Sequence, residues 1–141
     1  MGMLIRKCQK TEDFSVFNKM QKGAGSERRF DPRYWYFYYN SRPKIAIKFV
    51  AEDESEICGA IELIVLDGGH VFGMYVAPNH RRKGIASALL QESETYARRH
   101  GSTSIDLLVE TNNEPAIKLY QKAGYEITGS HMDLLEMKKI I

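Results

Sequence analysis

The spacing of hydrophobic residues changes several times along the chain, and each change marks the border of a predicted element. A short extended run predicts a strand at Met3–Lys7. Apolar residues at helical spacing then predict a helix over residues 12–22. Asp31 followed by Pro32 supplies a helix cap and a proline at the first helical position, which predicts a second helix over residues 31–40.

The middle of the chain changes to the apolar and alternating runs that are typical of strands. Strands are predicted at Ile45–Ala51, Ile57–Leu66 and His70–Val76. Polar turns at Glu52–Glu56 and Asp67–Gly69 separate them, and the two glycines of the second turn suit a hairpin.

Helices and strands alternate in the last third of the chain. Helices at Gly84–Arg99 and Asn113–Lys122 flank a short buried strand at Ile105–Val109. Two closing strands follow at Tyr125–Thr128 and Met132–Lys138. The complete order is β-α-α-β-β-β-α-β-α-β-β, which predicts an α/β (α+β) fold around a mixed sheet of about seven strands with about four helices.

Composition and charge narrow the class of protein. The 141 residues carry 20 basic and 18 acidic side chains, a formal net charge of +2. This near-balance argues against a nucleic-acid-binding module, which usually has a clear basic excess. Two cysteines, Cys8 and Cys58, are too few for a disulfide framework. No apolar run resembles a signal peptide or a membrane span, so we expect a cytoplasmic protein with one domain over residues 1–141 and no membrane partner.

A basic loop joins the predicted strand His70–Val76 to the following helix. Free backbone N–H groups at a helix start lie at the positive end of the helix dipole and bind phosphate oxygens without any particular side chain. Glycine in such a loop lets a ligand approach the backbone closely, and arginine adds a bidentate contact. A solvated basic loop that caps a helix is the alternative. The residues of this loop and helix start are Arg81, Arg82, Lys83, Gly84, Ile85 and Ala86.

The pattern Arg81-x-x-Gly84-x-Ala86 resembles the Q/R-x-x-G-x-G/A motif of the GNAT superfamily of N-acetyltransferases. The resemblance implies that the loop holds the pyrophosphate of coenzyme A. It also implies that backbone groups of the preceding strand bond the pantetheine arm, as an added β-strand would. The strand residues concerned are Met74, Tyr75 and Val76.

Residues 113–125 resemble the other signature of the same superfamily, N-x-x-A-x-x-(F/L)-Y-x-K-x-G-F/Y. Together with the predicted strands, the two motifs extend the resemblance over about residues 57–138 and imply a GNAT-like, largely antiparallel sheet. We expect Asn113, Ala116 and Tyr120 beside the coenzyme, although Asn113 also suits a helix cap and Ala116 also suits packing on the sheet. The matched residues are Asn113, Ala116, Leu119, Tyr120, Lys122, Gly124 and Tyr125.

The resemblance assigns Tyr120 the role of general acid. Attack of an amine on a thioester releases a thiolate whose parent thiol has a pKa of roughly 8–9. A phenol with a pKa of about 10 can donate its proton to that sulfur as charge develops. The alternative is an aromatic core residue whose hydroxyl lies at the surface.

A protonated amine cannot attack, so a base is needed, and two residues are candidates. His70 has a suitable reference pKa of about 6.5. Strict alternation would place it on one face with Phe72, Met74 and Val76. It lies eleven residues before the phosphate motif, where relatives that acetylate protein lysines carry a glutamate base. Glu62, in the preceding strand, is the second candidate, as a base or as a counter-charge for a cationic acceptor. Surface positions are the alternative for both.

The acceptor side is less specific. Relatives that acetylate ribosomal-protein N-termini often carry a glutamate twelve residues before the tyrosine, and this chain has Leu108 there, which argues against an N-terminal peptide acceptor. Residues 30–39 hold seven aromatic side chains, which suit an acceptor wall, the core, or an interface such as that of a homodimer.

The sequence therefore predicts an acetyl-CoA-dependent N-acetyltransferase. The acceptor is a primary amine of an unknown small molecule or peptide, which attacks directly in a ternary complex. No cluster of His, Cys, Asp and Glu has the spacing of metal ligands, so no metal is expected. The alternative function is an acyl-CoA-binding sensor with little or no turnover.

Overall fold

The structure is a computed structural model of the chain. Residues 3–9, 13, 15–16, 19, 45–65 and 69–141 are described. For Ile45, His70–Gly73 and His131 the description is limited to the backbone. The predicted helix over residues 31–40 and most of the predicted helix over residues 12–22 lie outside the described residues, as does most of the turn at Asp67–Gly69.

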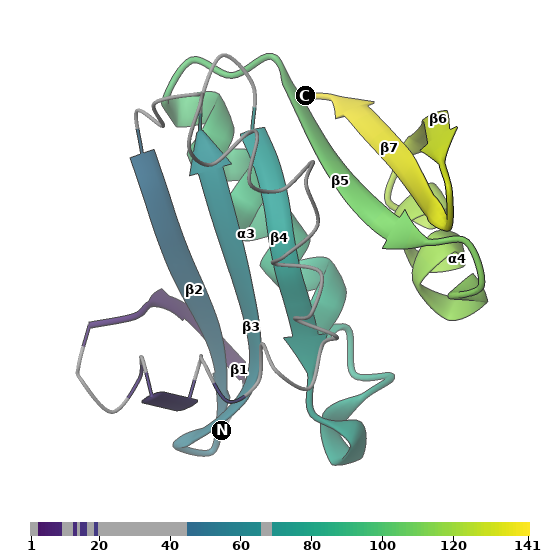
Figure 1. Cartoon of the computed structure of the whole chain (residues 1–141). Coiled ribbons are helices and arrows are strands. Elements are labelled where there is room, and N and C mark those ends of the chain that lie inside the picture. The colour runs from purple at the N-terminus through teal and green to yellow at the C-terminus, as the bar shows by residue number, and fades with distance from the viewer. Residues whose placement is uncertain (1–2, 10–12, 14, 17–18, 20–44, 66–68) are drawn as a thin grey trace.

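Seven strands form one sheet in the order β1-β2-β3-β4-β5-β7-β6 (Figure 1). Five of its neighbouring pairs are antiparallel and one, β4 with β5, is parallel. The predicted class, a mixed and largely antiparallel sheet, is therefore confirmed. The strands are β1 (Met3–Lys7), β2 (Ile45–Asp53), β3 (Glu56–Val65), β4 (Gly69–Val76), β5 (Ser104–Glu110), β6 (Glu126–His131) and β7 (Leu134–Ile140).

Two of the predicted turns are tighter than the sequence indicated. Strands β2 and β3 are joined by Glu54 and Ser55 alone, with φ angles of 51° and 69°. Two consecutive left-handed residues match the twist of antiparallel strands. The pairing of β2 with β3 therefore extends into the polar stretch Glu52–Glu56 that was predicted to be the turn. Similarly, Met132 has a φ of 56° and belongs to the turn before β7, not to the strand itself.

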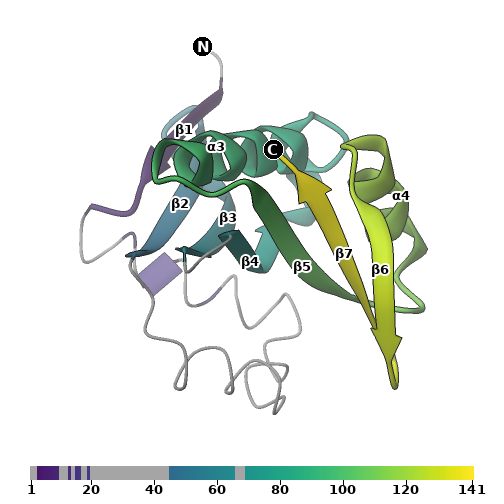
Figure 2. The ribbon, with the colours of Figure 1, turned by 90° about the horizontal axis from the view of Figure 1, so that it is seen from above.

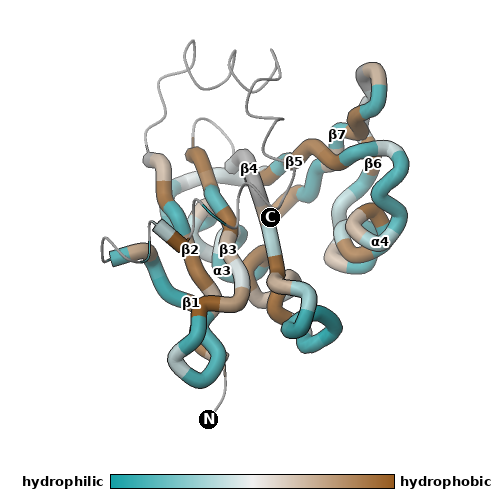
Figure 3. Tube along the Cα trace, turned by 60° about the horizontal axis from the view of Figure 1, so that its bottom comes forward, coloured by the Kyte–Doolittle hydropathy of each residue, from teal (hydrophilic) through white to brown (hydrophobic). Residues whose placement is uncertain are grey.

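Two helices cover one face of the sheet (Figure 2). Helix α3 (Ile85–Arg99) packs on strands β1–β4, and helix α4 (Glu114–Lys122) lies beside β6 and β7. The hydrophobic stretches of β3 and β5 contribute to this interior (Figure 3). Its largest buried side chains include Phe49, Ile61, Leu63, Leu89, Ile105, Tyr125 and Met137.

Gly59 of β3 allows α3 to lie close to the sheet. A Cβ atom there would come within 3.0 Å of Ile85 Cγ2 and 3.2 Å of Leu89 Cδ1. Contacts below 3.4 Å force neighbouring atoms to move, so a larger residue would push the first turns of α3 away. The start of α3 is thus held against the beginning of β3 and the end of β4.

Strands β4 and β5 pair only at their beginnings and then diverge (Figure 1). The pairs are Gly69 with Ile105, His70 with Asp106 and Val71 with Leu107. The β5-facing edge of β4 beyond Val71 therefore has no strand partner among the described residues.

The register between β3 and β4 shifts by one residue between Ala60 and Glu62. Such a bulge interrupts the two-residue alternation and increases local twist. Strict two-residue alternation along β4 is therefore wrong, and the face on which the His70 side chain lies stays a prediction. Met74 and Val76 pack towards the core beneath α3.

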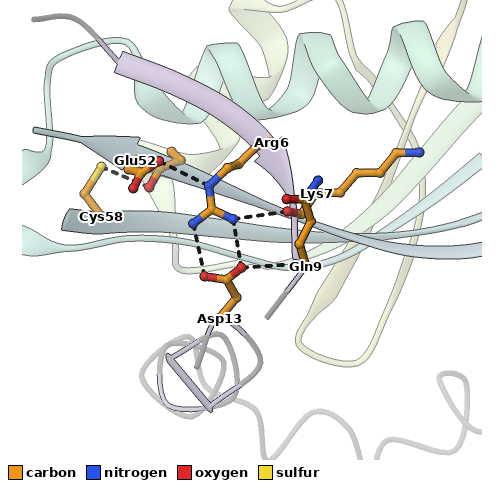
Figure 4. Close-up of polar contacts among 7 residues, drawn as sticks. Arg6, Lys7, Gln9, Asp13, Glu52 and Cys58 are labelled. Carbon is orange, nitrogen blue, oxygen red and sulfur yellow. Dashed lines mark hydrogen bonds and ion pairs between the residues drawn. The ribbon is translucent and has the colours of Figure 1, made fainter. Parts of the chain in front are cut away.

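The opposite face of the sheet carries an ion-pair network at its β1 edge (Figure 4). The guanidinium of Arg6 makes two hydrogen bonds to the carboxylate of Asp13, at 2.8 and 3.0 Å, and one to Glu52 at 3.1 Å. The N–H of Gln9 also donates to Asp13. Because Asp13 is helical and only 4% exposed, this network fixes the helix to the sheet at Asp13.

Candidate functional site

The junction between β4 and α3 has an unusual backbone. After Val76 the chain forms a short 3-10 turn, Pro78–His80, and the exposed residues 81–84 lead into α3. Arg82 and Gly84 have φ angles of 65° and 77°. Only glycine adopts such angles without strain, so Arg82 is held there at a cost of about 1 kcal/mol. Strain of this kind is common where a backbone is shaped to hold a ligand.

Six consecutive N–H groups at this junction have no hydrogen-bond acceptor in the part of the chain that the structure describes. The first helical bond runs from the N–H of Ala88 to the carbonyl of Gly84, at 3.0 Å. Among the described residues, no acceptor is bonded to the N–H groups of residues 82–87. Helix starts bind anions through such groups, with the helix dipole adding to the attraction. A Cβ on Gly84 would meet nothing within 4 Å, so the space over this backbone is open.

The side chains around the loop brace it. The Nε of Arg81 donates to the carbonyl of Val76 at 3.0 Å, and its guanidinium carbon lies 5.8 Å from the centre of the Tyr75 ring. Lys83 Nζ lies 3.8 Å from the carboxylate of Asp53. His80 Nδ1 lies 3.5 Å from the same carboxylate. The loop is therefore tied both to β4 and to the end of β2.

Helix α4 begins and ends with well-defined caps. The side chain of Asn113 accepts a hydrogen bond from the N–H of Ala116 at 3.3 Å, so the predicted capping role is confirmed. At the other end Gly124 has a φ of 100°, and the N–H of Tyr125 donates to the carbonyl of Tyr120 at 2.9 Å. These caps define the first and last turns of the helix and therefore fix the position of Tyr120 in its last turn.

Tyr120 is buried, but its hydroxyl has no hydrogen-bond partner in the described part of the chain. The side chain, on α4, is 8% exposed and belongs to the main hydrophobic core. Burial raises its pKa to about 12, because the charged phenolate is poorly solvated there. Among the described residues nothing hydrogen-bonds to the hydroxyl. The phenol is therefore fully protonated at neutral pH and is available to another group.

Glu62 is buried on the face of the sheet that lies opposite α3. It is 4% exposed, and its carboxylate lies 3.0 Å from Lys48 Nζ on β2. In the register Glu62 is paired with Phe72, directly after the last residue that pairs β4 with β5. The Glu62 carboxylate is thus on the strand next to β4, level with the point where β4 and β5 separate. The surface alternative for Glu62 is wrong.

The structure gives less information about His70. Its backbone lies opposite Ile64 and Asp106, but its side chain is not described. His70 as a base therefore stays a prediction.

The sequence profile of the acetyltransferase (GNAT) family matches residues 13–125, which is most of the chain. The chain belongs to this family.

Two relatives are similar to this GNAT chain in sequence, and one solved structure is similar to it in fold. An N-alpha-acetyltransferase of Sulfurisphaera tokodaii is 32% identical over 66% of the chain. The catalytic subunit of the N-terminal acetyltransferase B complex of Saccharomyces cerevisiae is 43% identical over 41% of it. The matched stretches span only 64% and 31% of those two proteins. The PaiA N-acetyltransferase of Thermoplasma acidophilum, crystallised with coenzyme A, superimposes over all of both chains with a TM-score of 0.79 at 20% identity.

Several features of this GNAT chain were missed by sequence reasoning. Lys48 was not identified as the partner of Glu62, although each is a charged residue with apolar neighbours on both sides in its strand and cross-strand pairs of opposite charge are common. Glu94, a buried carboxylate in α3, was also missed. Its position in the helix gives it no recognisable motif, and only the folded chain brings Tyr125 and Lys139 to it.

The two cysteines of this GNAT chain are unreactive in character. Cys58 is fully buried, and its thiol contacts the carbonyl of Ala51 at 3.5 Å. Cys8 is half-buried, and burial raises its pKa to about 11. Among the described residues no group of three or more His, Cys, Asp or Glu side chains is arranged to hold a metal ion. None of the helices in the described part of the chain has the length and apolar character needed to cross a membrane.

Proposed function

We propose that this GNAT chain transfers an acetyl group from acetyl-CoA to a primary amine of a small molecule or peptide, by direct attack in a ternary complex. The observation that carries the proposal is the combination of two free backbone surfaces at one junction. One is the run of N–H groups at residues 82–87, and the other is the unpaired edge of β4 beyond Val71.

The coenzyme fits these two surfaces in one orientation. Its diphosphate binds the free N–H groups at the start of α3, with the exposed side chains of Arg82 and Lys83 adding positive charge. Ile85 and Ala86 contribute backbone groups there, and Ala86 leaves room for the ligand. The pantetheine arm then runs along the open edge of β4 beside Met74, Tyr75 and Val76, where its amides replace a missing strand. The coenzyme complex of the Thermoplasma acidophilum protein supports this fold as a coenzyme A carrier.

Tyr120 supplies the proton for the leaving sulfur. The amine nitrogen forms a bond to the acetyl carbonyl carbon while the carbon–sulfur bond breaks. The thiolate takes the Tyr120 proton to give free coenzyme A, and the phenolate recovers a proton from water. A pKa of about 12 keeps the phenol protonated throughout the physiological range. Asn113 and Ala116, at the start of the same helix, lie beside the coenzyme in this arrangement.

Glu62 and His70 remain the two candidates for the base that accepts the amine proton. The burial of Glu62 and its position beside the diverging strands favour a functional role. Lys48 compensates the buried charge while no acceptor is bound, as a buried carboxylate requires. His70 lies in the strand that borders the coenzyme, which keeps it in consideration.

The acceptor is a primary amine whose carrier is not defined by these residues. Two relatives carry names of N-terminal acetyltransferases, which supports a peptide α-amine. Leu108 stands where such relatives often carry a catalytic glutamate, and this opposes it. The same relatives are acetyltransferases by name and give no support to the sensor alternative. A cytoplasmic location and a homodimer remain predictions.

Two measurements test the proposal in order. Acetyl-CoA and coenzyme A should each raise the melting temperature, because a ligand that binds only the native state stabilises it. A thiol-release screen over peptides with free N-termini, lysine peptides and small amines should then identify the acceptor. A melting temperature unchanged by either coenzyme would contradict the proposed site, and binding without thiol release from any amine would contradict the transfer reaction.

A further inference from the structure

Glu94 is a buried charge outside both sequence motifs. It lies in α3 and is 7% exposed. Burial of an ionised carboxylate is costly unless it is paired and hydrogen-bonded. An apolar side chain would fill a helix position facing the core at lower cost, so the carboxylate needs a reason to be there.

Two strong partners surround Glu94. Its Oε2 accepts a hydrogen bond from the hydroxyl of Tyr125 at 3.0 Å, and its Oε1 accepts one from Lys139 Nζ at 2.7 Å. Tyr125 is 1% exposed and follows the end of α4, and Lys139 belongs to β7. The Lys139 chain also lies over Gly124, where a Cβ atom would come within 3.3 Å of its Cε.

These contacts join two halves of the molecule that the sheet joins weakly. Helix α3, which begins at the phosphate-binding loop, packs on β1–β4. Tyr125 and Lys139 belong to the other half, with β5, β7, β6 and α4 (Figures 1 and 2). Only three residue pairs connect β4 with β5 before the strands diverge. Glu94 therefore adds a polar connection, on the helical face, to the hydrophobic core that both halves share.

Tyr125 in turn contacts Tyr120 in two ways. Its N–H donates to the Tyr120 carbonyl at 2.9 Å. Its ring packs edge-on against the Tyr120 ring, with centroids 6.0 Å apart and an interplanar angle of 63°. Anchoring the Tyr125 hydroxyl on Glu94 consequently fixes one wall of the site in which the Tyr120 phenol lies.

We propose that Glu94 is a positioning residue, which holds Tyr125 and Lys139 and thereby sets the Tyr120 hydroxyl at a fixed place relative to the helix that binds the coenzyme. This role rests on the proposed function for its effect on turnover. Its physical basis is that a small displacement of a reacting group costs rate, and misplacement by about 1 Å can cost about a hundredfold.

The first test is a double-mutant cycle. Tyr125→Phe keeps the ring and removes only the bond to Glu94, and Glu94→Gln keeps the shape and removes the charge that Lys139 needs. Each should lower kcat by about tenfold, with the KM for acetyl-CoA changed by less than about twofold. In a Tyr120→Phe background the same substitutions should lower kcat by less than about twofold, because they act through the missing hydroxyl. Equal losses in both backgrounds would overturn the proposal.

The matched control is Ser93→Ala. Ser93 precedes Glu94 in α3, is fully buried, and its hydroxyl has no hydrogen-bond partner among the described residues. This variant should leave kcat and KM unchanged, since it alters the same helix without touching the connection to Tyr125. A kcat loss for Ser93→Ala as large as that for Tyr125→Phe would assign the effect to general loosening of α3 and overturn the positioning role.

A second readout does not depend on turnover. In protein carrying 13C-labelled tyrosine, the Tyr120 signal is assigned by its loss in Tyr120→Phe. Its phenol should stay protonated through pH 11 in the unmodified protein, because its pKa lies at about 12. In Tyr125→Phe and Glu94→Gln it should titrate closer to the ordinary value of about 10, as water reaches it. An unchanged titration would overturn the positioning role even if no amine acceptor were found, whereas failure of every amine alone would count only against the transfer reaction.

Discussion

The Nε of Arg81 donates a hydrogen bond of 3.0 Å to the carbonyl of Val76. The first residue of the phosphate motif is thus attached to the last residue of β4. Because its guanidinium also lies near the Tyr75 ring, it fixes the direction in which the loop leaves the strand. The backbone proposed to bind the diphosphate and the strand edge proposed to bind pantetheine are thereby held at a set distance from each other.

This relationship separates the roles of the three basic residues. Arg81→Ala should weaken binding of coenzyme A and of pantetheine alike, since it loosens the strand edge that both use. Arg82→Ala and Lys83→Ala should weaken coenzyme A several-fold, by about fivefold each, while pantetheine binding stays the same, because pantetheine has no phosphate. Calorimetry with both ligands measures the difference. Loss of coenzyme A binding alone in Arg81→Ala would show that Arg81 contacts phosphate directly.

Gly101 is a matched control for Gly84, because both glycines have a left-handed backbone but only Gly84 lies at the proposed phosphate site. Gly84 and Gly101 both have left-handed φ angles, 77° and 89°, and a Cβ on either meets nothing within 4 Å. Alanine at either position should therefore lower the free energy of unfolding by about 1 kcal/mol through backbone strain. Only Gly84→Ala should also weaken coenzyme binding, since its methyl group points into the phosphate site. Equal coenzyme affinity for the two variants would place the diphosphate elsewhere.

Tyr120→Phe isolates the hydroxyl. The substitution should lower kcat by about a hundredfold and leave the affinity for coenzyme A nearly unchanged, because it removes a proton donor used only as the sulfur departs. Its effect on stability should be small, since no described residue bonds to the hydroxyl. Steady-state kinetics and calorimetry measure these quantities. A kcat equal to that of the unmodified protein would remove Tyr120 from the reaction.

The raised pKa of Tyr120 predicts a particular pH dependence of stability. The folded state binds the phenolic proton more tightly than the unfolded state, with a pKa of about 12 against about 10. The stabilising contribution should be complete below pH 10 and should be lost as the pH rises from 10 through 12. Denaturant unfolding across this range should show a smaller decline for Tyr120→Phe. Activity should likewise show no loss from Tyr120 ionisation between pH 7 and 10.

Glu62 and Lys48 give a prediction that distinguishes structure from catalysis. Lys48→Met removes the partner, on β2, of the buried Glu62 carboxylate. The free energy of unfolding should fall by about 3 kcal/mol, the low end for breaking a buried ion pair, because Lys48 is partly exposed. Glu62→Leu combined with Lys48→Met should recover most of that loss. Unfolding in urea measures both variants, and a double variant no more stable than Lys48→Met would contradict the pairing.

The identity of the base follows from pH profiles. If Glu62 accepts the amine proton, Glu62→Gln should abolish the acidic limb of kcat/KM and His70→Ala should retain it. If His70 is the base, His70→Ala should abolish the acidic limb of kcat/KM and Glu62→Gln should retain it. An acidic limb retained in both variants would point to a water molecule or to another group of the chain.

Local chemistry explains which elements the sequence predicted well. The caps of α4 depend on Asn113 and Gly124, which act within one or two turns of their own position and are readable as residues. The geometry of the junction proposed to bind phosphate is equally local, because Gly84 and the following helix start provide it. Strand ends were less well predicted, since the Glu54–Ser55 turn adopts its conformation to satisfy the pairing of β2 with β3.

By itself, the sequence determined the order of the seven strands and of helices α3 and α4, the GNAT resemblance, and Tyr120 and the residue 81–86 loop as the candidate chemistry. Those signals depend on neighbours along the chain. Only the tertiary structure decided that a bulge breaks the alternation of β4, that Lys48 pairs with Glu62, and that Glu94 joins α3 to Tyr125. Each of these depends on segments that are distant in sequence, 14 residues apart for the Lys48–Glu62 pair and 31 for Glu94 and Tyr125. The energy of a buried charge is set by whichever groups the folded chain brings around it, which no local pattern records.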